Sequence, residues 1–269
     1  MSNFFKNKVV VITGGSDGIG KALIEQLLPL GAKIATCARN QDKLYDLQLR
    51  HSTSPLHCVV ADVSNYNDCE LFIDSTIKQF GGIDILINNA GIVMKALFED
   101  ADLEVFRKVM EINYFGTVYC SKLALGSIIE RKGTIVGLAS IAAYRGLPGR
   151  SGYSASKSAI IGLLEALRIE LQDKEVNVMW VSPGFTRSNT RIAALNAKGE
   201  MQGRSPVNES ELMSPEDCAR HILKAIEKSK RTLVLTFLGK QTVFLTKFFP
   251  SLADKLTKRF YMKDGKLIK

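Results

Sequence analysis

The 269-residue sequence has no apolar run approaching the roughly 18 residues that a transmembrane helix needs. Residues 1–15 lead directly into an apolar β-branched stretch, without the layout of a secretory signal peptide. Internal repeats, low-complexity stretches and Pro/Gly-rich linkers are also missing. With 46% hydrophobic and 23% charged residues, the composition predicts a cytoplasmic globular protein built as one large domain.

Disulfide and metal-ligand patterns are absent too. The five cysteines are scattered at positions 37, 58, 69, 120 and 218, odd in number and without CxxC spacing. This usage predicts buried thiols in a reducing compartment. The three histidines, at positions 51, 57 and 221, form no metal-ligand pattern with them, so we expect no metal site.

Acidic residues are scarce in the last fifth of the chain. Residues 220–269 contain thirteen Lys and Arg against three Asp and Glu, a net charge of +10, whereas the whole chain carries +9. The first 219 residues are therefore nearly neutral. The positive charge is therefore concentrated in the C-terminal tail and not spread over the whole protein surface.

Apolar β-branched runs alternate with helical patterns along the chain. Strands are predicted at 8–12, 33–37, 57–61, 83–87, 134–138, 176–181 and 232–236. Helices are predicted at 21–30, from 65 to 80, at 101–130, 153–172 and 214–229, and the polar segment 187–213 is predicted to be a loop or lid. This alternation predicts an α/β fold with a parallel sheet covered by helices on both faces.

A glycine-rich turn, TGGSDGIG at 13–20, joins the first strand to the first helix. Gly14 and Gly18 permit a tight turn, and Gly20 lets the helix pack close to the strand. The helix N-terminus would then present free N–H groups to a pyrophosphate. The segment 15–21 also fits most of a P-loop, but Ala22 stands where that motif needs Ser or Thr to bind Mg²⁺.

The stretch GYSASK, at 152–157, places Tyr153 four residues before Lys157, on one face of a helix. A nearby cation favours the phenolate and would lower the pKa of the tyrosine, which makes it a usable acid. Ser140 ends the apolar run 133–140, at the carboxyl end of a predicted strand, where α/β sheets bind ligands. Taken alone, Tyr153 and Lys157 could also be an ordinary pair on a helix surface.

Together with Asp62, NNAG at 88–91, Asn113 and SPGFT at 182–186, these motifs resemble the single-domain branch of the short-chain dehydrogenase/reductase family. The resemblance covers about residues 8–236, in order and with family-like spacing. It implies a doubly wound (Rossmann) fold with a seven-stranded parallel sheet and a bound nicotinamide cofactor.

The resemblance also implies the site. Tyr153 would be the catalytic acid/base, Lys157 would lower its pKa and hold the nicotinamide ribose, Ser140 would bind the substrate oxygen, and Asn113 would hold a water in a proton relay. The cofactor-binding positions, besides Tyr153 and Lys157, would be Gly14, Ser16, Asp17, Gly18, Ile19, Gly20, Arg39, Lys43, Asp62, Val63, Asn89, Ala90, Gly91, Pro183, Gly184 and Thr186.

The turn after the second strand, at 38–40, has no acidic residue to accept a hydrogen bond from a ribose 2′-hydroxyl. Arg39 can instead donate to a 2′-phosphate, with Lys43 nearby, or it can be a solvated surface charge. Asp17 would repel that phosphate unless it points to solvent. We therefore predict NADP(H) in preference to NAD(H).

Residues 237–269 form a Phe/Leu-rich basic extension of the domain at 1–236. The extension resembles the lipid-handling members of the family, which include a dehydrogenase/reductase member-7-like group, 3-ketodihydrosphingosine reductases and 11β-hydroxysteroid dehydrogenases. Two alternatives stay open: a helical hairpin packed on this chain or on a partner subunit, and a membrane-associated surface on anionic lipid. Nucleic-acid binding is not expected, because no recognised module is present.

We expect a ketone and a secondary alcohol as reactants, on a lipophilic molecule such as a 3-keto sphingoid base, an acyl-dihydroxyacetone phosphate or a steroid. The 187–213 segment, with Arg187, Arg191 and Arg204, would close over it. The alternative is an NADP(H)-binding sensor with little turnover. A homodimer or homotetramer, paired through helices near 101–130 and 152–172, is implied by the resemblance.

Overall fold

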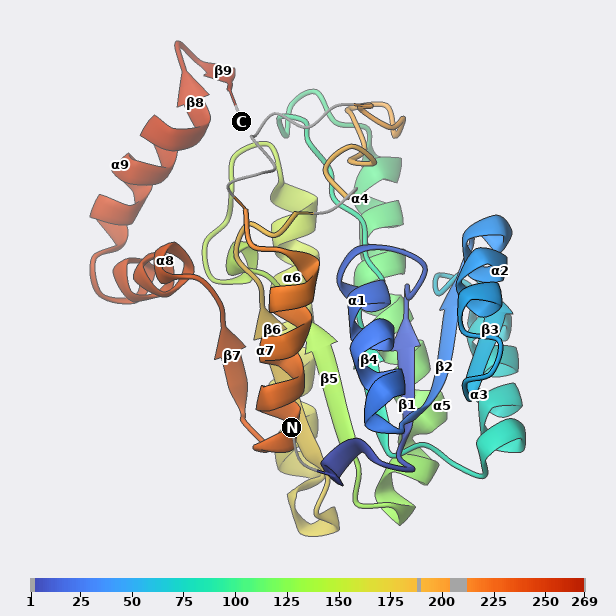
Figure 1. The fold of residues 1–269 in the computed structure, drawn as a ribbon. Coiled ribbons are helices and arrows are strands. Elements are labelled where there is room, and N and C mark those ends of the chain that lie inside the picture. Colours follow the sequence, from blue (N-terminus) through green and yellow to red (C-terminus); the bar gives the residue numbers. More distant parts are fainter. Residues whose placement is uncertain (1–2, 188–189, 204–211, 269) are drawn as a thin grey trace.

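The computed structural model describes residues 3–187, 190–203 and 212–268. Its centre is a seven-stranded parallel sheet with the strand order β3-β2-β1-β4-β5-β6-β7 (Figure 1). The strands are β1 Val9–Thr13, β2 Lys33–Ala38, β3 Leu56–Val60, β4 Ile85–Asn88, β5 Thr134–Leu138, β6 Asn177–Ser182 and β7 Thr232–Val234. The predicted doubly wound α/β fold is confirmed.

Helices cover both faces of this sheet (Figure 1). They are α1 Gly18–Leu27, α2 Gln41–Arg50, α3 Tyr66–Phe80, α4 Leu103–Met110, α5 Gly116–Glu130, α6 Ser151–Glu170 and α7 Pro215–Glu227. Of the helices in the described residues, none is long and apolar enough to cross a membrane.

The strands are buried on both sides, as their continuous apolar runs predict. On β1, Val10 and Ile12 pack with α1 and α7, while Val11 faces the cluster formed by α3, α5 and α6. The five cysteines are free thiols, and only Cys58 is partly exposed. The predicted buried thiols are therefore confirmed, apart from this partial exposure.

Most predicted boundaries differ from the observed ones by one to three residues; the first helix, for example, is Gly18–Leu27 rather than 21–30. The fourth strand is Ile85–Asn88 rather than 83–87. The helix predicted at 101–130 is divided by a π-helical turn at Glu111–Phe115. The last strand ends at Val234, because Thr236 has a φ of +64° and its side chain caps a new helix by accepting from the Gly239 N–H.

The tail forms two helices and a small hairpin beside β7 (Figure 1). Helix α8 is Phe237–Phe248 and α9 is Pro250–Tyr261, followed by β8 Met262–Lys263 and β9 Lys266–Leu267. Pro250 is in the first turn of α9, where a backbone N–H would have no partner within the helix. Because proline cannot continue a preceding helix, α8 ends before it. Arg145 joins the tail to the body through an ion pair with Asp254 and a 3.3 Å hydrogen bond to Thr257.

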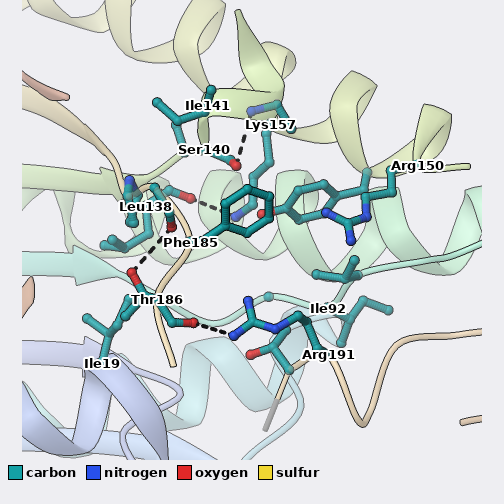
Figure 2. Close-up of a pocket in the computed structure, with 18 of the residues that line it drawn as sticks. Ile19, Ile92, Leu138, Ser140, Ile141, Arg150, Lys157, Phe185, Thr186 and Arg191 are labelled. Carbon is teal, nitrogen blue, oxygen red and sulfur yellow. Dashed lines mark hydrogen bonds between the residues drawn. The ribbon is translucent and has the colours of Figure 1, made fainter. Parts of the chain in front are cut away.

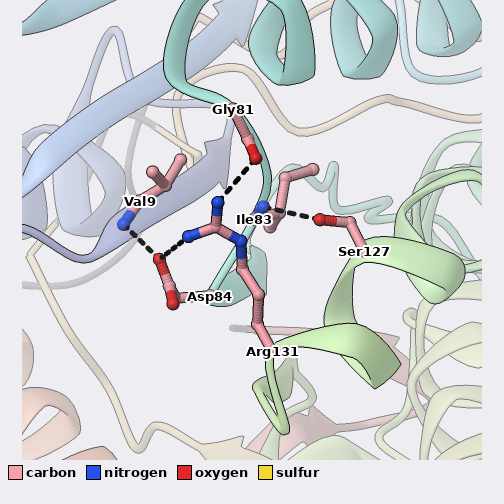
Figure 3. Close-up of polar contacts among 6 residues, drawn as sticks. All are labelled: Val9, Gly81, Ile83, Asp84, Ser127 and Arg131. Carbon is pink, nitrogen blue, oxygen red and sulfur yellow. Dashed lines mark hydrogen bonds and ion pairs between the residues drawn. The ribbon is translucent and has the colours of Figure 1, made fainter.

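Polar contacts join the amino ends of the strands, at the edge of the sheet opposite the glycine turn (Figure 3). The Asp84 carboxylate accepts a 2.8 Å hydrogen bond from the Val9 N–H and lies 3.3 Å from the Arg131 guanidinium. Arg131 also donates to the Gly81 carbonyl oxygen at 2.5 Å, and the Asp84 carbonyl oxygen accepts from the Thr134 N–H at 2.9 Å. Asp84 therefore aligns the starts of β1, β4 and β5.

We expect Asp84→Ala to lower the free energy of unfolding by roughly 1–3 kcal/mol, because the Val9 N–H is buried and would lose its acceptor. Asp84→Asn keeps an acceptor oxygen and should cost less. Urea unfolding of the two variants checks this. A loss below about 0.5 kcal/mol in Asp84→Ala would contradict the structural role of the carboxylate.

Candidate functional site

A cavity of about 1150 Å³ opens at the carboxyl ends of the strands. It spans β1 and β4, the point where the strand order reverses and where doubly wound sheets bind ligands. All the predicted site residues line this cavity except Gly20 and Asn113, which lie behind its wall. The fold therefore brings together segments from residue 14 to residue 186.

The glycine turn is fixed to the sheet by Asn89. Its side-chain amide donates to the carbonyl oxygens of Thr13 at 2.9 Å and Gly14 at 3.0 Å, and its backbone N–H donates to the Thr13 hydroxyl at 3.0 Å. A Cβ on Gly20 would lie 2.3 Å from the Gly14 carbonyl oxygen. Gly20 thus serves the close packing of α1 on this turn, as the sequence predicted.

The charges near the glycine turn are already paired. Asp17 caps α1 by accepting from the Gly18 N–H at 2.7 Å, and its other oxygen lies 2.6 Å from the Lys43 ammonium. Arg39, whose side chain is 57% exposed, lies 3.7 Å from the Asp62 carboxylate. The negative charge of Asp17 is therefore offset by Lys43 rather than left facing the cavity alone.

Tyr153 stands in the cavity wall beside Ser140. Burial raises the pKa of Tyr153, and a hydrogen bond with the Ser140 side chain and the charges of Arg150 and Arg191 lower it in part. The net shift is upward, so the phenol is protonated at neutral pH. Ser140 also caps the short helix at Ile141–Ala143, where it accepts from the Ala142 N–H.

Lys157 is 5% exposed and donates to the Leu138 carbonyl oxygen at 2.6 Å. Its ammonium lies 5.9 Å from the centre of the Tyr153 ring. Burial lowers the pKa of Lys157 to about 8. In this structure, the contributions that lower the pKa of Tyr153 come from Ser140 and two arginines, while Lys157 is bound to the end of β5.

Asn113 is fully buried in the π-helical turn between α4 and α5, a kind of distortion that is frequent at functional sites. Its side chain accepts from the Ile92 N–H at 2.8 Å and donates to the Ile92 carbonyl oxygen at 3.0 Å and to the Ser156 hydroxyl at 2.9 Å. A Cβ on Gly91 would lie 3.1 Å from the Asn113 side-chain oxygen and 3.3 Å from the Lys157 nitrogen. Gly91 therefore permits Asn113 and Lys157 to approach the same point.

Residues 183–186, which follow β6, form another part of the cavity wall. A Cβ on Gly184 would lie 2.4 Å from the Thr236 hydroxyl, so a glycine is needed at this position. Arg191 donates to the Thr186 carbonyl oxygen at 2.8 Å. The described part of the predicted 187–213 loop pairs with the body through Met94 and Leu195, and Arg204 lies outside the described residues.

Two parts of the cavity wall were missed by the sequence analysis. One is Arg150, which precedes α6 and points into the cavity (Figure 2). The other is the tail, since residues from α8 and α9, and Ile268 after the final hairpin, line the cavity. No local pattern marks either of them, because the contacts join segments about a hundred residues apart.

A model of the short-chain dehydrogenase family matches residues 8–199. A similar relative is dehydrogenase/reductase SDR family member 7B from Rattus norvegicus, 36% identical over 98% of this chain and 84% of that protein. Another is 11-beta-hydroxysteroid dehydrogenase A from Arachis hypogaea, 34% identical over 97% of this chain and 78% of that protein.

Solved structures agree on the fold. A short-chain dehydrogenase/reductase from Burkholderia phymatum, in complex with NAD, has a TM-score of 0.83 at 23% identity and covers 94% of this chain and 96% of its own. A short-chain dehydrogenase from Streptomyces avermitilis has a TM-score of 0.80 at 25% identity, covering 93% and 96%. The family match and the relatives along nearly the whole sequence show that this chain belongs to the short-chain dehydrogenases, a family of oxidoreductases.

Proposed function

We propose that the protein is an NADP(H)-dependent oxidoreductase that interconverts a lipophilic ketone and a secondary alcohol. The observation that carries this proposal is the meeting of Tyr153, Ser140 and Lys157 in one cavity that also contains the glycine turn. Carbonyl reduction requires a hydride and a proton. The glycine turn would bind the nicotinamide cofactor that supplies the hydride, and the nearby hydroxyls can donate the proton to the carbonyl oxygen.

The cavity fits a dinucleotide cofactor. The N-terminus of α1 and the residues Ser16, Gly18 and Ile19 would hold the pyrophosphate. Asp62 and Val63 would flank the adenine, Asn89, Ala90 and Gly91 the centre of the cleft, and Pro183, Gly184 and Thr186 the nicotinamide amide. A Cβ on Gly14 would lie 3.0 Å from the Ala90 Cα, so this passage between the two strand ends is narrow.

The chain's own part in the reaction concerns the substrate oxygen and a proton. The bound nicotinamide supplies or receives the hydride. In reduction, the Ser140 hydroxyl donates a hydrogen bond to the carbonyl oxygen and Tyr153 gives its proton to that oxygen, which completes the alcohol. Lys157 and a water held at Asn113 return a proton to Tyr153, and the reverse steps serve oxidation.

Tyr153→Phe should abolish turnover while changing NADP(H) affinity only a few-fold, because the phenol moves a proton and is not the main cofactor anchor. Lys157→Ala should impair both, since the ammonium has two proposed roles. NADPH oxidation with a ketone panel and a cofactor-binding titration measure the two effects. A Tyr153→Phe enzyme with a tenth of the wild-type rate would show that another group is the acid.

The same panel separates the enzyme from the second candidate, an NADP(H)-binding sensor. A wild-type protein that binds the cofactor but oxidises none of it with any ketone, from sphingoid ketones to steroids and acyl-dihydroxyacetone phosphates, would favour the sensor. The presence of Ser140, Tyr153 and Lys157 around one cavity favours the enzyme.

Preference for the 2′-phosphate is supported by the charges around the second strand. Arg39 lines the cavity, and its guanidinium is 3.7 Å from the Asp62 carboxylate. Because this ion pair is long and exposed to solvent, the Arg39 side chain can turn from Asp62 to a 2′-phosphate. The Asp17 carboxylate accepts from the Gly18 N–H and is paired with Lys43. It therefore repels a phosphate less than an unpaired carboxylate would. NAD(H) lacks the group that Arg39 would bind.

Arg39→Asp should shift the preference from NADP(H) toward NAD(H). A hydrogen bond to a charged group contributes roughly 1.5–3 kcal/mol, which corresponds to about a 10- to 150-fold loss of NADP(H) affinity. Cofactor titrations of wild type, Arg39→Asp and the neutral control Arg39→Ala measure this. Unchanged affinities would identify Arg39 as a surface charge only.

The tail supports a lipophilic substrate and an anionic membrane surface. Its exposed apolar side chains include Phe237, Leu238, Phe244, Phe248, Phe249, Leu252, Leu256 and Phe260. Leu238, Leu256 and Phe260 also line the cavity, so the apolar surface continues into it. Seven lysines and Arg259 lie in the same extension, against two aspartates. We propose that this surface lies on anionic lipid, with the cavity open toward it.

The protein should co-sediment with anionic vesicles at low salt and less as salt rises, because each basic residue near the surface adds roughly 1 kcal/mol that salt screens. Phe244→Ser with Phe248→Ser should weaken this binding, since both rings are more than half exposed. Phe98→Ser, at an exposed ring on the body, is the matched control. A protein that stays in the supernatant at low salt would leave the tail as a packing or oligomer element.

A homo-oligomer is also proposed. Four aromatic rings cluster at α3, the π-helical turn and α5, and Tyr66 and Phe115 among them are exposed. The π-helical turn and α5 fall within 101–130, one of the two helical segments through which the resemblance implies a dimer or tetramer, whereas α3 does not.

A further inference from the structure

Arg150 has an unusual environment for a charged side chain. It is 9% exposed, and its Nε atom is buried without a hydrogen-bond partner. In the part of the chain that the structure describes, its guanidinium makes one contact of note, with the Tyr261 ring at 5.7 Å. A buried guanidinium without an acceptor is costly, because a charge removed from water needs a compensating partner.

Other arginines in the cavity are satisfied or exposed. Arg145 is paired with Asp254 and bonded to Thr257. Arg259 lines the cavity but is exposed to solvent. The acidic residues among the described lining residues are Asp17 and Asp62, both at the cofactor end of the cavity. The protein therefore supplies Arg150 with no negative charge of its own in the described residues.

Arg150 lines the same cavity as Ser140 and Tyr153. It immediately precedes α6, three residues before Tyr153. Its charge acts on the Tyr153 phenol, as does that of Arg191. Figure 2 shows the side chains of Arg150 and Arg191 approaching the same space from different elements.

We propose that Arg150 binds an anionic group of the substrate, a phosphate or a carboxylate a few bonds from the reacting carbonyl. A planar guanidinium matches both groups with two parallel hydrogen bonds. This inference rests on the proposed function and narrows its substrate class. An anionic lipid ketone is favoured, a neutral steroid leaves Arg150 unpaired, and the ammonium of a sphingoid base is repelled.

The location of Arg150 separates this anion from the phosphates of the cofactor. The glycine turn and the N-terminus of α1 lie at the β1 end of the cavity, whereas Arg150 contacts Tyr261 at the end of α9. Arg150 thus stands where the tail closes the substrate part of the cavity. Arg191 differs, because it is bonded to Thr186 in the segment proposed to meet the nicotinamide.

The test compares matched ketones with wild type and Arg150→Met. The probes are 1-hydroxy-2-hexadecanone and its phosphate ester, and methyl 3-oxohexadecanoate and its free acid. The readout is the ratio of kcat/KM for the anionic ketone to that for its neutral partner. We expect wild type to favour an anionic member, and Arg150→Met to reduce this ratio by roughly 10- to 100-fold, mainly through KM. The phosphate and acid pairs show which oxyanion is preferred.

Arg220→Met is the control, at a half-exposed arginine of α7 that does not line the cavity, and should keep the wild-type ratio. Arg150→Lys should restore part of it, because a charge remains without the bidentate geometry. Equal use of neutral and anionic ketones by wild type, or an unchanged ratio in Arg150→Met, would overturn the anion site and leave the reductase intact.

A binding measurement tests the anion site even if the wild-type protein reduces none of these ketones. Octyl phosphate should bind wild type saturated with NADP⁺, and roughly 10- to 100-fold more weakly to Arg150→Met. Equal binding to the two proteins would overturn the anion site. Absent turnover with intact, Arg150-dependent binding would instead overturn the proposed enzymatic function.

Discussion

The site depends on the hydrogen bonds by which Asn89 holds the glycine turn against the ends of β1 and β4. Its amide donates to the Thr13 and Gly14 carbonyl oxygens, where the backbone leaves the strand for the turn. The turn can come this close only because Gly14 and Gly20 carry no Cβ. The same cavity is lined by Arg39 and by Tyr153.

The residues proposed to carry the chemistry and those proposed to set the specificity come from different parts of the chain. Ser140, Tyr153 and Lys157 are positioned by β5 and α6, which belong to the common fold. The tail adds the wall formed by α8, α9 and Ile268, and Arg145 joins it to the body. We propose that this arrangement, with the wall attached separately from the centre, lets the same hydroxyl donors serve substrates of different size and charge.

Much of this could be predicted from the sequence, since β-branched runs mark buried strands and the glycine turn and Tyr153 have fixed spacings. The π-helical turn at Asn113 could not, because no local pattern marks it and the Asn113 side chain bonds to Ile92 and Ser156, which are distant in sequence. Arg150 looked like any polar residue before a helix, and only the fold of the tail over it shows its burial. Local patterns thus predict the elements, whereas the environment of a charge depends on what the fold places against it.

The central claim is that this cavity transfers a hydride between a nicotinamide and a carbonyl carbon. The most direct measurement incubates the protein with NADPH deuterated at the transferred position and an anionic lipid ketone, and analyses the alcohol by mass spectrometry. The account predicts deuterium on the carbinol carbon and none in the Tyr153→Phe reaction. A protein that binds NADPH tightly yet forms no deuterated alcohol from any of the ketones would contradict it.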